Sequence, residues 1–130
     1  MRTRAEDLFK QEKFEEALPL YSQLLALKLE SSEYNYRFGA CQLFTSQNKE
    51  EGIKYLNFAS KDPTAPSLAH FYYGLGLQLN YQFEKAVVKY EKYKTAASKK
   101  DKEADLVDLY ITQCKNGKTL VSNFTDISVI

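Results

Sequence analysis

The sequence predicts an all-α protein, in which three helix-turn-helix units stack into a solenoid and a single capping helix follows. Two observations support this prediction. Small residues return at intervals of 34 or 35 positions, and the apolar residues between them recur at i, i+3, i+4 and i+7. The first pattern is typical of repeat architectures, and the second is helical and not strand periodicity. With 130 residues and 44% hydrophobic content, the chain can bury one ordinary core, so we expect one domain over residues 1–122.

Two columns of small residues define the repeat. One column falls inside the first helix of each unit and the other inside the second helix, and the six residues are Ala5, Gly39 and Gly74, then Ala17, Gly52 and Ala86. Packed helices lie about 8–10 Å apart, and the closest approach tolerates Gly, Ala or Ser but not a branched side chain. We therefore expect these six positions to lie where the two helices of each unit cross.

The same spacing divides the chain into units, at about 1–31, 32–65 and 66–98. The middle unit contains one extra residue, which we place in its turn. Lys49 stands there at the position that Phe14 and Phe83 occupy in the neighbouring units. Pro19 lies inside the second helix of the first unit and predicts a mild kink, because proline removes one backbone hydrogen bond.

The segment after the third unit predicts one more amphipathic helix, at about 101–121. Its apolar residues keep helical spacing from Ala104 to Cys114, but it has no partner helix. A solenoid needs its last apolar face covered, so we interpret this helix as the cap. Residues 123–130 change to alternation, which indicates an extended tail or the start of a following domain.

Charge and hydropathy disfavour two classes of partner. Eighteen basic and 17 acidic residues leave a net charge of +1, so no strong field favours nucleic acid or anionic lipid. No apolar run approaches the roughly 20 residues of a membrane span, so we expect no direct membrane insertion.

The residues that carry chemistry are sparse. Cys41 and Cys114 have no second ligand at metal-binding spacing, so we expect buried free thiols and no metal site. The one histidine, His70, lies on a predicted helix and is expected to be structural. With no nucleophile, acid and base in a constellation, we predict no catalytic residues, no cofactor and no enzyme activity.

Binding of a protein or peptide partner is then the expected function. In such solenoids the first helices of the units line a concave groove. The residues in phase for this groove are Arg2, Glu6, Lys10, Glu33, Tyr36, Arg37, Phe71 and Gln78. Tyr36 and Phe71 are the expected anchors, because aromatic side chains bury much area at low entropic cost. The alternative that the apolar candidates simply pack against a neighbouring helix stays open.

The phased helix pairs resemble tetratricopeptide repeats over about residues 1–98. This resemblance implies a right-handed superhelical solenoid of three such units. The departures are Ala5 in place of the usual Gly, and Lys49 in place of an aromatic residue. Some members clamp the carboxylate of a chaperone tail with Lys and Asn side chains. Glu6, Leu68 and Tyr72 occupy those positions here, so this ligand is disfavoured.

A narrower group of repeat proteins resembles the chain in three longer segments, which are "EYNYRFGACQL", "GLQLNYQFEKAVVKYEKYK" and "ITQCKNGKTLVSNFTDISVI". They resemble the repeat module of Bacteroidetes envelope proteins, where it precedes a β-propeller-like region and a peptidoglycan-binding domain of the outer-membrane-protein-A type. Some of those proteins serve type IX secretion and gliding. The resemblance implies a periplasmic or outer-membrane-associated scaffold that recruits another envelope protein.

Two alternatives stay open at this point. The first is a free-standing cytoplasmic adaptor or regulator that binds a peptide. The second is self-association through an uncovered first helix, although we expect a monomer rather than an oligomer.

Overall fold

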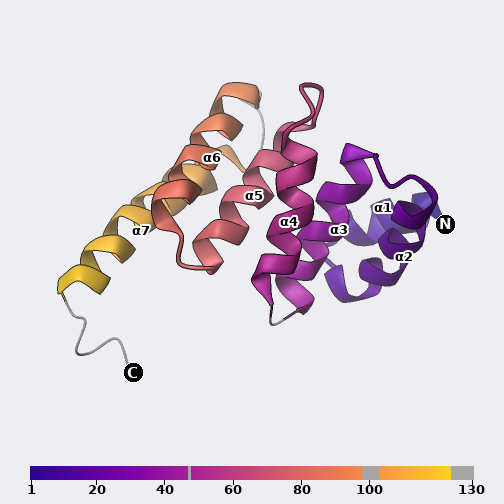
Figure 1. Ribbon diagram of the computed structural model, residues 1–130, viewed down its shortest axis with the longest axis horizontal. Helices are drawn as coiled ribbons and strands as arrows, with labels where there is room; N and C mark the ends of the chain where they lie inside the picture. Colours follow the sequence, from indigo (N-terminus) through magenta and orange to yellow (C-terminus); the bar gives the residue numbers. More distant parts are fainter. Residues whose placement is uncertain (47, 98–102, 124–130) are drawn as a thin grey trace.

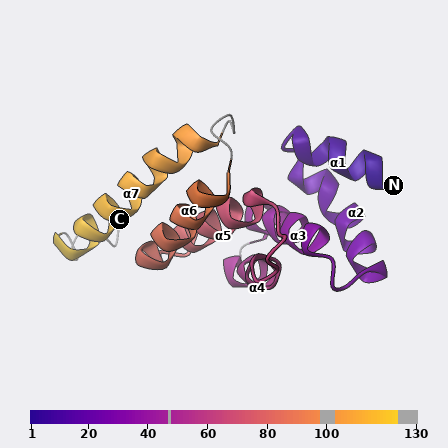
Figure 2. The same cartoon turned by 90° about the horizontal axis from the view of Figure 1, so that it is seen from above.

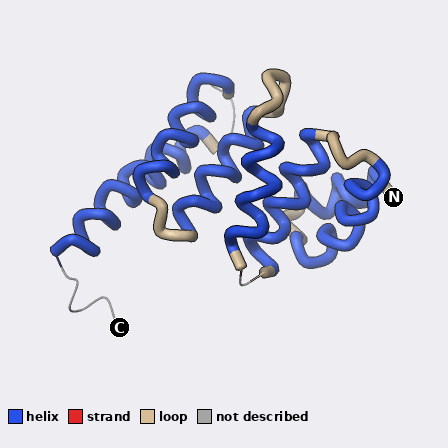
Figure 3. The backbone as a smooth tube through the Cα atoms, viewed as in Figure 1, coloured by secondary structure: helices blue, strands red, loops and turns tan. Residues whose placement is uncertain are grey.

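The computed structural model of the chain describes residues 1–46, 48–97 and 103–123, with side chains as far as Gly117 in the last segment. Within these residues every regular element is an α-helix (Figures 1 and 3). The helices are α1 (Arg2–Lys10), α2 (Phe14–Leu27), α3 (Ser32–Thr45), α4 (Lys49–Ser60), α5 (Ser67–Leu79), α6 (Phe83–Ala96) and α7 (Ala104–Asn123). The described part of the chain is therefore all-helical, as the sequence predicts.

Each helix packs against the next one along the chain, and α3 also packs against α5. Figure 1 shows this order as a row that runs from α1 at one end to α7 at the other. Seen from above, the row is curved, with α1 and α7 on the same side and α4 on the opposite side (Figure 2). None of the helices in the described part of the chain combines the length and apolar character that a bilayer span requires.

The turns α1–α2 and α5–α6 have the same backbone structure. Glu12 in the first turn and Tyr81 in the second have positive φ angles, of 60° and 62°. In both turns this residue donates its N–H to the carbonyl three residues back, and the next residue donates to the carbonyl five residues back, at 2.8–3.0 Å. This pair of bonds is the Schellman motif, which ends a helix with one residue in the left-handed region.

The α3–α4 turn ends its first helix differently. The Lys49 ammonium group donates to the carbonyl oxygen of Leu43, and to that of Ser46 at 3.1 Å. A cation near the last carbonyl groups stabilises a helix C-terminus. Lys49, in place of a phenylalanine, thus supplies a different helix cap in the middle unit. The connections α1–α2, α3–α4 and α5–α6 all span three positions, so the extra residue predicted for the turn instead lengthens the end of α3.

Three of the predicted small residues, Gly39, Gly52 and Gly74, lie at close approaches between helices. Gly39 of α3 faces Gly52 of α4, and Ala5, Ala17 and Ala86 are completely buried. Gly74 makes room for the ring of Tyr90 on α6, because a Cβ atom there would lie 2.7 Å from ring atoms.

The C-terminal helix α7 covers α6. Val107, Ile111 and Cys114 form its buried face. The extended segment predicted for the last residues falls almost entirely on residues 124–130, which lie outside the described residues. At the other end, α2 is assigned as one continuous helix through Pro19.

Candidate functional site

Four of the predicted groove residues form a cluster of charges between α1 and α3. Arg2 lies 3.0 Å from a carboxylate oxygen of Glu6 and 3.5 Å from one of Glu33. Arg37 lies 3.6 Å from Glu33 and 4.0 Å from Glu6. The two positive and two negative side chains face one another, so their main effect is to join α1 to α3 and not to attract a charged ligand.

Arg37 is the centre of this cluster. Its Nη1 donates to the Tyr21 hydroxyl at 2.8 Å, and its Nε donates to the Tyr36 hydroxyl at 3.2 Å. The guanidinium carbon also lies 5.4 Å from the centroid of the Phe9 ring. Only 15% of its side chain is exposed, so we interpret Arg37 as a structural residue that binds three helices together.

The two predicted anchors are buried in this structure. Tyr36 is 2% exposed and Phe71 is 5% exposed. Phe9 of α1 reaches past α3 and contacts the Tyr72 ring of α5, with the centroids 5.6 Å apart, and Tyr72 in turn contacts Tyr36 and Phe71. The prediction that these two rings are exposed anchors for a partner is therefore wrong, because both rings pack against neighbouring helices. Lys10, by contrast, is exposed at the end of α1.

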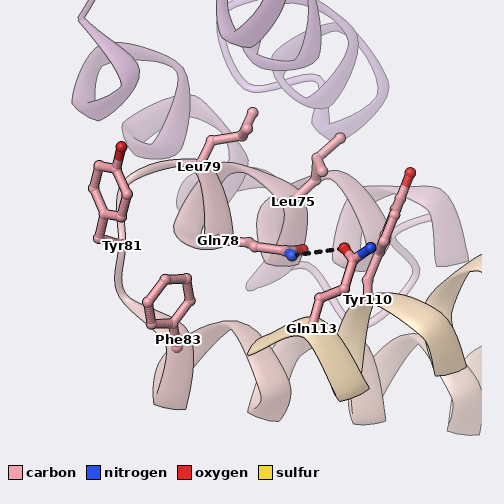
Figure 4. Close-up of a pocket in the computed structure, with 7 residues that line it drawn as sticks. All are labelled: Leu75, Gln78, Leu79, Tyr81, Phe83, Tyr110 and Gln113. Atoms are coloured by element: carbon pink, nitrogen blue, oxygen red, sulfur yellow. Dashed lines mark hydrogen bonds between the residues drawn. The ribbon is translucent and has the colours of Figure 1, made fainter. Parts of the chain in front are cut away.

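The last predicted groove residue, Gln78, lines a hollow between α5 and α7 (Figure 4). The hollow has a volume of about 390 Å³, and its lining consists of Leu75, Gln78, Leu79, Tyr81, Phe83, Tyr110 and Gln113. None of these side chains carries a charge. Leu79 is 40% exposed and Tyr81 is 80% exposed, so apolar surface is presented to solvent at the edge of the hollow.

Two glutamine amides provide the polar groups of the hollow. The Tyr90 hydroxyl donates to Gln78 Oε1 at 2.7 Å, which fixes the orientation of that amide. Its Nε2 then points toward Gln113 Oε1, 3.4 Å away (Figure 4). Apolar walls with a small number of oriented polar groups are the usual composition of a binding site.

Sequence reasoning did not identify Leu79, Tyr81, Tyr110 or Gln113 as site residues. A signal for Tyr110 was present in α7, where Leu106 and Tyr110, at i and i+4, lie beside the stripe that contains Val107, Ile111 and Cys114. A helix that only covers the end of a solenoid needs one apolar stripe, so further apolar residues beside it indicate another contact. Gln113 is polar and gave no such signal.

The two cysteines and the histidine do not line the hollow. Cys41 and Cys114 are buried free thiols. His70 is 8% exposed, and its burial, together with nearby Lys92 and Lys89, lowers its pKa. Among the described residues, no three His, Cys, Asp or Glu side chains come close enough to hold a metal ion.

Comparison with known proteins gives no relative from which a role can be transferred, since no family model and no curated protein matches the chain.

Proposed function

We propose that this chain is a non-catalytic scaffold for protein–protein interaction, built as three tetratricopeptide-like units and a capping helix. The shared Schellman turns of α1–α2 and α5–α6 support the repeat, because equal backbone hydrogen bonds recur at equivalent positions of the first and third units. The close approach of Gly39 and Gly52 supports the predicted crossing in the second unit.

The observation that carries the proposed function is the uncharged hollow between α5 and α7. It lies on the first helix of the third unit and on the capping helix, at one end of the curved row (Figures 2 and 4). Its walls offer apolar area and amide groups, which suit binding by burial and hydrogen bonding. We therefore place the partner at this end of the concave side.

A display library of random peptides tests this function. The immobilised chain is used for selection, and the enriched peptides are tested on a variant with Leu79→Arg and Gln113→Arg, two side chains with solvent-exposed area. Leu27→Arg on α2, where the native side chain is 76% exposed, is the matched control. The proposal requires peptides that bind the native chain and the control but not the double variant. If no peptide is enriched, or if the double variant binds as the native chain does, the proposal is wrong.

The sequence phrases that resemble Bacteroidetes envelope proteins support a more specific assignment, in which the chain is the recruiting module of a larger envelope protein. An immunoblot of fractionated source cells tests this assignment. A band much larger than 15.0 kDa in the envelope fraction is expected. A soluble band of 15.0 kDa in the cytoplasm would instead assign the chain as a free-standing adaptor.

A further inference from the structure

Tyr81 combines an unfavourable backbone with an exposed side chain. Its φ of 62° lies in the left-handed region, where a residue with a Cβ atom is disfavoured and where this motif usually has Gly or Asn. Its ring is 80% exposed and touches only the edge of the hollow, through a T-shaped contact with Phe83 at 6.1 Å. Glu12 adopts the same φ in the first turn, so it is the exposed ring at the edge of the hollow, and not the backbone, that indicates a contact with a ligand.

The Tyr81 ring lies at the edge of the hollow. It stands beside Leu79 and Phe83 and extends the apolar wall of the hollow outward (Figure 4). An apolar group that enters between α5 and α7 would cover the exposed part of this wall. Tyrosine is well suited to such a contact, because its large ring loses little conformational freedom on binding.

The amide groups specify the ligand further. Gln78 Oε1 accepts from the Tyr90 hydroxyl, and one N–H of Gln78 faces Gln113 Oε1. The second N–H of Gln78 and the N–H groups of Gln113 are then the amide donors at the hollow, beside the hydroxyl groups of Tyr81 and Tyr110. The carbonyl groups of an extended peptide are acceptors of matching kind. A charged side chain would lose its hydration in the hollow without an opposite charge in the lining.

We propose that the hollow binds an extended, uncharged peptide segment. A large apolar side chain of this segment would enter between Leu75, Phe83 and Tyr110. Its main-chain carbonyl groups would accept hydrogen bonds from Gln78 and Gln113, and Tyr81 would cover it from the outer side. This inference rests on the proposed binding function and names the class of ligand.

The first test measures ligand chemistry. Short acetylated and amidated peptides alternate Thr with one variable residue, which is Leu, Phe, Asp or Lys, and a fluorescent label reports binding by anisotropy. The Leu and Phe peptides are expected to bind at least about tenfold more tightly than the Asp and Lys peptides. Equal or tighter binding of the charged peptides would overturn the inference. If none of these peptides binds while the display library yields binders, the ligand class is wrong and the scaffold function stands.

The second test separates the role of Tyr81 in binding from its effect on stability. Tyr81→Gly should weaken binding of the Leu peptide at least about tenfold, yet raise the melting temperature by about 4 °C, because glycine relieves the positive φ. Glu12→Gly is the matched control, since Glu12 occupies the same Schellman position in the first turn. It should give the same increase in melting temperature and leave peptide affinity unchanged. Affinity within about twofold of native for Tyr81→Gly would refute a contact between Tyr81 and the peptide.

A second copy of the chain is the competing occupant. Sedimentation across a range of concentrations distinguishes the two cases. The peptide proposal expects a monomer at every concentration for the native chain. A native dimer that becomes a monomer with Tyr81→Gly would assign the hollow to self-association and overturn the proposal.

Discussion

Gly39 and Gly52 face each other across α3 and α4 so closely that a Cβ atom on either one would lie 2.8 Å from the carbonyl oxygen of the other. This contact is reciprocal, and both opposing atoms belong to the backbone. A helix backbone cannot move aside as the end of a flexible side chain can. The crossing of the second hairpin therefore depends on glycine at both positions.

Gly39→Ala is expected to destabilise the fold by about 2 kcal/mol or more, despite the better helix propensity of alanine. Gly76→Ala is the control, because the atoms nearest to a Cβ atom there belong to the side chains of Ile53 and Leu43, both at 3.0 Å, and not to the backbone. We expect that control to change the free energy of unfolding by less than about 1 kcal/mol. Urea denaturation of both variants measures the difference, and equal losses would contradict the assignment of a backbone contact.

Arg37 provides the second prediction, because it joins α1, α2 and α3 through Glu6, Tyr21 and its own helix. Arg37→Met leaves two carboxylates and two hydroxyl groups without this partner, and should cost about 2–4 kcal/mol. Arg2→Met removes an arginine from the same cluster, but its side chain is 61% exposed, and we expect a loss below about 1 kcal/mol. Urea denaturation at low and high salt compares the two variants. A loss for Arg2→Met as large as that for Arg37→Met would show that simple surface charge, and not the buried network, stabilises this end.

The contrast between the predicted and observed sites has a physical origin. Periodicity within one helix reveals which face is apolar, so the helices and their close crossings could be predicted. It does not reveal which distant helix covers that face. Phe9 reaches from α1 to Tyr72 on α5, and this contact buries the region in which Tyr36 was expected to be open. The hollow was missed for the same reason, since Tyr110 lies opposite α5 only after α7 folds back.

We expect the free energy of unfolding to fall at alkaline pH. Burial raises the pKa of Cys41 to about 12, and it raises the pKa of Tyr21 to about 12 although Arg37 acts in the opposite direction. Burial also raises the pKa values of Tyr72 and Tyr90. In the unfolded chain these groups ionise near their ordinary values of 9.0 for the thiol and 10.0 for the phenols. Between those values and about 12 the unfolded state releases protons that the folded state retains, so the free energy of unfolding falls as pH rises.

From about pH 7.5, above the range in which His70 gains a proton, the urea midpoint should therefore stay constant up to about pH 8.5 and then fall steadily above about pH 9. The part of the tyrosinate absorbance that comes from the buried phenols should rise only together with the loss of helical circular dichroism, because these phenols ionise only when the chain unfolds. A midpoint that does not change up to about pH 11, or a complete rise in tyrosinate absorbance while the helices remain, would refute this prediction.

The burial of Tyr36 and Phe71 changes how the binding surface has to be tested. Replacement of both by Ala would remove two rings from the core, at about 3–5 kcal/mol each, which is comparable with the whole stability of a small domain. We expect this double variant to lose far-UV helicity at room temperature, so its failure to bind a partner would say nothing about a surface. Leu79→Glu is the informative change, because its side chain is already 40% exposed at the edge of the hollow. It should keep the native circular dichroism and a melting temperature within about 3 °C of native, and reduce binding of the Leu peptide. A folded Tyr36→Ala, Phe71→Ala variant with native stability would show that these rings do not form the core.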